Sequence, residues 1–198
     1  MTIMKKDYFK ERYNETHPFD PIVREVYSNA MASVYILQSG KDLRVFADDR
    51  TYLFLKDKLM PQNFKHVARI LECYEAVKGC EYCVISEPLN RDLLGPETTK
   101  SGINLFRDAW MQYHHGPEID IYNNIIRSYE TKDTTGEEAV VRYVEASERS
   151  QEEKSIALAL NEAYRDVMTL GTAMIWPLPM NVGITLDTVI KITNIGIR

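Results

Sequence analysis

The sequence has few cysteines, no long apolar run and no excess of positive charge. Its hydrophobic stretches fall short of the roughly 18 consecutive apolar residues of a membrane-spanning helix, so we expect no membrane partner. The first residues reach Lys5 and Lys6 without the apolar run of a secretory signal. Only three cysteines occur among 198 residues, an odd number that suits a reducing compartment. We therefore expect a cytoplasmic protein.

The charge balance argues against a nucleic-acid partner. The chain has 29 acidic and 24 basic residues and a net charge of −5, and its lysines and arginines form no cluster along the sequence. Such a balance opposes nonspecific binding to a phosphate backbone. The 44% hydrophobic content is ordinary for a globular protein, so a core can hold the fold without disulfides or a metal. We expect proteins as partners and no cofactor.

The spacing of apolar residues predicts a mainly helical fold. A bundle of five or six helices follows from apolar residues three and four apart over 20–40, 48–59, 61–79, 103–116, 117–129 and 137–170. Asp48 or Asp49 is expected to cap the second helix, and Gly40 and Gly79 to end the first and third. The middle of the last segment carries almost no apolar residue, so it either bends there or bridges solvent.

Three segments depart from the helical pattern. Residues 82–86 are short and apolar, as in a buried strand or a loop tether, and 87–102 resemble a long loop of the kind that binds something. The tail alternates apolar and polar residues and predicts a small C-terminal β-strand or hairpin. We therefore expect a helical domain over 1–181, whose first 17 residues form an arm, and a β element over 182–198, in one domain overall.

The cysteines are the first candidate for chemistry. Cys80 and Cys83 have the two-residue spacing that presents a pair of thiolates to zinc, and Cys73 would make a third sulfur ligand. His66 would stand about 10 Å along a helix from Cys73, too far to share an ion, so a fourth ligand would have to come from residues 114–115. Zinc is therefore the alternative to three structural cysteines that pack as small hydrophobic groups.

Arg107 and His114 are the second candidate. They lie about 20° apart around the predicted helix and can face one groove. These eight residues resemble a motif of the HEPN family of helical-bundle ribonucleases, which act on RNA without a metal. The resemblance implies that Arg107 steadies the scissile phosphate and that His114 serves as acid or base. The same residues also fit a surface arginine and a histidine that interacts with the negative end of its helix.

Interaction chemistry remains when these sites are set aside. A strand with one apolar face cannot stand alone in water, so the tail must pair within its own chain or with a neighbouring chain. The predicted contact residues are Val182, Ile184, Leu186, Ile190 and Ile192. We expect a non-enzymatic structural or adaptor subunit of a larger symmetric assembly, such as a homo-oligomer or a component of a viral (phage) particle. The alternatives are the metal-independent ribonuclease and a regulator that binds and inhibits another protein.

Overall fold

The computed structural model describes residues 6–28, 32–79, 81–113, 119–120, 125–127, 135–171, 174–175 and 177–196. The chain divides into two compact units. Unit 1 comprises Met1–Met60 and Arg69–Pro88, and unit 2 comprises Pro61–Ala68 and Leu89–Arg198. Each unit is described by itself.

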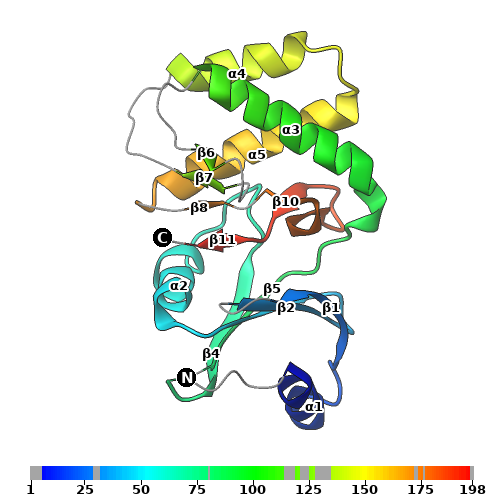
Figure 1. Cartoon of the computed structure of the whole chain (residues 1–198), viewed down its shortest axis with the longest axis vertical. Helices are drawn as coiled ribbons and strands as arrows, with labels where there is room; N and C mark the ends of the chain where they lie inside the picture. Colours follow the sequence, from blue (N-terminus) through cyan, green and yellow to red (C-terminus); the bar gives the residue numbers. More distant parts are fainter. Residues whose placement is uncertain are drawn as a thin grey trace. The chain divides into compact units, whose positions relative to one another are not determined.

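Unit 1 is built on a five-stranded antiparallel sheet (Figure 1). Its spatial order is β1 (Ile22–Ser28), β2 (Ala32–Leu37), β3 (Asp42–Phe46), β5 (Glu81–Ser86) and β4 (Ile70–Val77). Valine, isoleucine and tyrosine are frequent in these strands, and such β-branched and aromatic side chains pack well on a pleated surface. The segment predicted as a strand or tether at 82–86 is part of β5, next to the middle of the sheet.

One face of this sheet is covered by helix α1 (Lys6–Thr16). The register places Leu43 opposite Ile85, and both pack with Phe9 and Tyr13 of α1 in one buried cluster. The predicted N-terminal arm is therefore a helix whose apolar stripe lies in the core of unit 1. Between β3 and β4 lie helix α2 (Asp49–Phe54) and the π-helical turn η1 (Leu55–Leu59), and Asp48 caps α2 as expected.

The prediction of a mainly helical bundle is wrong. Residues 20–40 contain β1 and β2, and β4 lies within 61–79, so an antiparallel sheet stands where two helices were expected. Gly40 and Gly79 have positive φ angles of 82° and 72°, but each lies in a connection between two strands. A left-handed glycine serves a helix end and a hairpin turn equally well, and it does not distinguish them.

Unit 2 contains the longer helices α3 (Pro96–Tyr113), α4 (Thr135–Ala146) and α5 (Gln151–Met168). The α3 helix packs against both α4 and α5 (Figure 1). The helical segment predicted over 137–170, whose middle was expected to bend or to bridge solvent, forms two helices. Ser150 begins α5 with a capping box in which its hydroxyl accepts from the Glu153 backbone N–H. The expected apolar stripe of α5 is buried at Ile156, Leu160, Ala163 and Val167.

The remaining elements of unit 2 are short. The 3-10 turn η2 (Asp92–Leu94) and the start of α3 occupy the predicted loop, and strands occur at β6 (Ile119–Asp120) and β7 (Ile125–Arg127), where a helix was predicted. These two strands continue into a four-stranded sheet with β8 (Met174–Ile175) and β11 (Ile195–Gly196). After the 3-10 turn η3 (Pro179–Asn181), β9 (Val182–Ile184) pairs with β10 (Ile190–Ile192) as the C-terminal hairpin.

In the part of the chain that the structure describes, every helix is too short or too polar to cross a lipid bilayer.

Candidate functional site

The two described cysteines lie on neighbouring strands but face opposite sides of the sheet of unit 1. Tyr74 is the partner of Cys83 in the register of β4 and β5, and Cys73 is the partner of Val84. Since consecutive residues of a strand point to opposite faces, the side chain of Cys73 points away from that of Cys83. The two cannot ligate one ion. Cys80 lies outside the described residues.

Burial also makes these thiols poor metal ligands. It raises the pKa of Cys73 to about 11, although the Arg44 guanidinium acts in the other direction, and it raises the pKa of Cys83 to about 12. Zinc binds the thiolate, which a raised pKa disfavours. Among the residues that the structure describes, no three histidine, cysteine or acidic side chains are grouped so that they could hold a metal ion.

Arg107 is half-buried on α3. One guanidinium nitrogen, Nη1, lies 3.5 Å from Oδ1 of Asn104, and its Nε is enclosed without a hydrogen-bond partner in the described part of the chain. His114 lies outside the described residues. The predicted pairing of Arg107 with His114 therefore stays a prediction.

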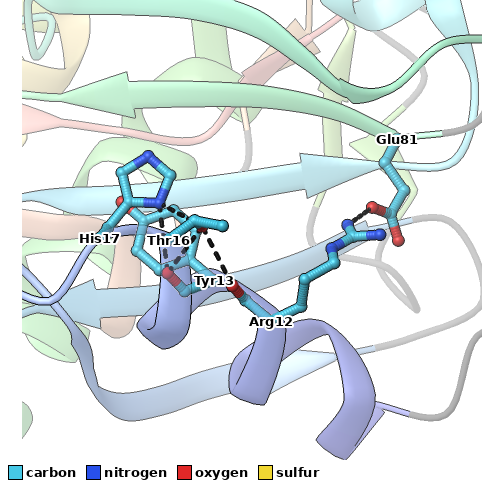
Figure 2. Close-up of polar contacts among 5 residues, drawn as sticks. All are labelled: Arg12, Tyr13, Thr16, His17 and Glu81. Atoms are coloured by element: carbon cyan, nitrogen blue, oxygen red, sulfur yellow. Dashed lines mark hydrogen bonds and ion pairs between the residues drawn. The ribbon is translucent and has the colours of Figure 1, made fainter.

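A polar and aromatic cluster joins α1 to the sheet of unit 1 (Figure 2). Arg12 makes an ion pair with Glu81 of β5, and the ring of His17 stacks on Tyr13 with 4.2 Å between centroids. Burial raises the pKa of Tyr13 to about 12, so its phenol stays protonated at neutral pH. The groups in this cluster are engaged with one another, as expected of a structural contact.

The five predicted contact residues of the tail differ in exposure. Val182 and Ile192 are buried, and Ile184 and Ile190 are half-buried. Their strands pair with each other, and the backbone of Ile184 also forms two hydrogen bonds with Asn90, of 2.8 and 2.9 Å. Leu186 alone among the five is fully displayed, with 97% of its surface exposed.

Two more exposed apolar side chains accompany Leu186 on adjoining segments. Leu93 of η2 is 65% exposed and Met180 of η3 is 39% exposed. The η2 turn contacts β9, and Nε of Arg91 donates a 2.6 Å hydrogen bond to the carbonyl of Met180. We call Leu93, Met180 and Leu186 the apolar rim. The sequence pattern indicates only Leu186, because Leu93 and Met180 fall in segments without a regular apolar spacing.

No protein-family model and no curated protein matches this chain. Among the solved structures that are similar to parts of it are two of a phosphotransferase and one of a kinase. One is a thermostable mutant of the aminoglycoside phosphotransferase APH(4)-Ia in its apo form, with 13% identity over 50% of this chain and 36% of that chain and a TM-score of 0.34. A ternary complex of the same enzyme with ADP and hygromycin B has 9% identity over 58% and 40% of the two chains and a TM-score of 0.33.

The third structure is PK-1, a kinase of the Cydia pomonella granulovirus, with 10% identity over 61% of this chain and 49% of that chain and a TM-score of 0.32. This chain thus spans less than half of the matched chain in each of the three structures. The prediction of a virion component is corrected together with that of a helical bundle, which the five-stranded antiparallel sheet of unit 1 contradicts, and we do not carry it further. TM-scores this low support no argument about activity.

The sequence lacks the phosphate-binding and catalytic motifs of protein kinases. Protein kinases hold ATP, magnesium and substrate through a G-x-G-x-x-G loop, an H-R-D loop and a D-F-G motif. None of these three motifs occurs anywhere in the sequence.

Proposed function

We propose that the chain is a non-enzymatic structural subunit that associates with a second copy of itself through the apolar rim. The observation that carries this proposal is the exposure of Leu186, 97% of whose surface faces solvent. Burial of one leucine side chain contributes about 1.5–3 kcal/mol, so an exposed rim favours association. Large exposed apolar patches commonly mark protein interaction sites.

The two leucines of the rim are displayed on turns that are already ordered. Leu186 lies in a turn closed by the backbone of Thr185, whose N–H donates to the carbonyl of Val189 at 3.0 Å. Leu93 lies on η2, where Oδ1 of Asn90 accepts from the backbone N–H groups of Asp92 and Leu93 at 3.1 and 3.3 Å. Such preorganisation lowers the entropy cost of association.

A second copy is the occupant that the chemistry of the rim favours. The rim itself offers apolar groups, and apolar surface is complementary to a copy of itself without any matching of charges. In a twofold dimer the same patch is used by both subunits, which is the commonest arrangement of homo-oligomers.

The test is native mass spectrometry and light scattering of the full chain and of the Leu93→Ser, Leu186→Ser double variant. We expect a dimer or a higher oligomer that the double variant converts to a monomer. Phe19→Ser is the matched control, because Phe19 is 98% exposed but lies in unit 1, outside the rim. A wild-type chain that stays monomeric, or a double variant that still assembles, would contradict the proposal.

A further inference from the structure

A cleft lies between α4 and α5 of unit 2. Its volume is about 520 Å³, within the range of small-molecule sites. The α4 helix contributes Glu138, Val141 and Arg142 to its wall, and Leu158 of α5 adds a second apolar side chain. The cleft thus combines an apolar surface with charged groups.

Asn161 of α5 also lines the cleft and is only 6% exposed. Nε1 of Trp110 lies 3.1 Å from its Oδ1. Because an indole N–H can only donate, the amide must present its oxygen to Trp110 and direct its nitrogen elsewhere. In the described part of the chain, Nδ2 of Asn161 has no hydrogen-bond partner, and this atom is not enclosed by the protein. Its two N–H donors therefore open on the cleft.

The arginine side chains of the cleft make it rich in hydrogen-bond donors. Arg142 is exposed, and no hydrogen bond or ion pair joins it to any residue that the structure describes. Arg165 also lines the wall, and a guanidinium group can only donate. The opposing carboxylate of Glu162 is already engaged, since its Oε2 lies 3.1 Å from Nε2 of His66 and 3.9 Å from Nζ of Lys65.

We propose that this cleft binds a small carboxylate with an apolar body. The carboxylate oxygens accept hydrogen bonds from Arg142 and from Nδ2 of Asn161, and the body packs on Val141 and Leu158. Arginine and amide donors match the acceptor-only carboxylate, and the charge on both partners strengthens the bonds. Glu138 stands one helical turn from Arg142 and opposes an anion, so it limits the affinity. The cleft shares no residue with the apolar rim, and the inference does not depend on the proposed function.

The probe is hexanoate, titrated into the full chain and followed by nuclear magnetic resonance of backbone and side-chain amides. We expect saturable shifts at Asn161 and its neighbours, with binding tighter than that of acetate, which lacks the body, and of hexanamide, which lacks the charge. Arg142→Gln should weaken hexanoate binding at least tenfold, whereas Glu138→Gln should strengthen it severalfold. Arg149→Gln is the control, because Arg149 lies in the turn between α4 and α5, outside the lining.

The opposite signs of the two cleft variants separate a defined site from general charge attraction. Equal binding of hexanoate and hexanamide would overturn the role of the arginine, and equal binding of hexanoate and acetate would overturn the role of the apolar wall. The absence of saturation in the wild-type chain, or a wild-type affinity in Arg142→Gln, would overturn the site itself.

Discussion

Gly102 of α3 lies directly against Ile156 of α5. A Cβ atom at position 102 would stand 2.7 Å from the Cβ of Ile156 and 2.9 Å from the carbonyl oxygen of Glu153. Real Cβ atoms do not approach other heavy atoms so closely, and the carbonyl belongs to the backbone, which cannot rotate away as a side chain can. The absence of a side chain at Gly102 is therefore what lets the two helices pack at this point.

This contact reverses the usual sign of a glycine-to-alanine substitution in a helix. Alanine is normally favoured by about 1 kcal/mol, but overpacking a core costs about 1–3 kcal/mol. We expect Gly102→Ala to lower the free energy of unfolding by up to about 2 kcal/mol in urea titrations followed by circular dichroism. Lys100→Ala, at an exposed position of α3, is the control and should change stability little. A stabilised Gly102→Ala would show that α3 and α5 do not pack this closely.

The sequence correctly predicted those features of the fold that depend only on residues close together along the chain. The apolar stripe of α5 and the cap at Asp48 depend on residues within one or two turns, and both are present. The strands of unit 1 depend on partners far along the chain, such as the pairing of Leu43 with Ile85. In 20–40, apolar residues three and four apart match the period of a helix, but the valine and tyrosine residues of this segment prefer strands, and in the structure they form β1 and β2.

The candidate sites also differ in whether a local sequence pattern indicates them or only the tertiary structure does. Leu186 falls on the apolar alternation of the tail, whereas Leu93 and Met180 lie outside any periodic pattern. The cleft is formed where α4 and α5 pack together, so only the structure shows it. Its faint sequence signal is the pair Glu138 and Arg142, four residues apart on one helix face, which a reading of charge spacing could have marked.

The thiols of Cys73 and Cys83 should react slowly. With the pKa of Cys73 raised from 9.0 to about 11, roughly 100-fold less thiolate is present at pH 8, and the thiolate is the nucleophile. We expect alkylation of Cys73 by iodoacetamide to be about 100-fold slower in the folded chain than in urea. The measurement uses a Cys80→Ser background with mass-spectrometric detection. Equal rates in the folded and unfolded chains would contradict the burial of this thiol.

The same shifts predict a loss of stability in alkali. The folded-state pKa values of Cys73 and Cys83 are raised, so the contribution of these protonated thiols to the free energy of unfolding is fully present below the pKa of the unfolded thiols, near 9. It is lost as the pH rises through about 11 and 12. Urea titrations from pH 7 to pH 10 should show stability falling above about pH 9, and a Cys83→Ala variant should show a smaller fall. An identical pH dependence in the variant would exclude Cys83 as a source.

The capping box should make the start of α5 sensitive to one hydroxyl group. The Ser150 hydroxyl accepts from the Glu153 backbone N–H at 3.3 Å, and the Glu153 carboxylate accepts from the Ser150 backbone N–H at 2.7 Å. Loss of such a cap costs about 1 kcal/mol, so Ser150→Ala should lower the stability by about that amount. Ser155→Ala is the matched control inside the same helix, because the Ser155 hydroxyl donates only to a carbonyl one turn earlier. Similar losses in both variants would argue against the cap.

The ion pair between Arg12 and Glu81 is expected to couple α1 to the sheet of unit 1. The side chain of Glu81 is only 10% exposed, so water can solvate its carboxylate poorly when the Arg12 guanidinium is removed. Arg12 also lies over the ring of Phe9, at 5.7 Å from its centroid, and methionine at position 12 would keep part of that apolar contact. We therefore expect Arg12→Met to cost about 1–3 kcal/mol through the unpaired Glu81, while Lys10→Met on the exposed side of α1 costs little.

A double-mutant cycle of Arg12→Met with Glu81→Gln isolates the pair from the loss of packing. If the two charges stabilise each other, the double variant loses less free energy of unfolding than the sum of the single variants, with a coupling of about 1 kcal/mol or more. A surface pair screened by water would give a coupling near zero. The coupling should also persist at high salt, since a pair shielded from solvent is screened little by added ions. Additive losses would instead mean that hydrophobic contacts such as those of Phe9, and not the charges, hold α1 on the sheet.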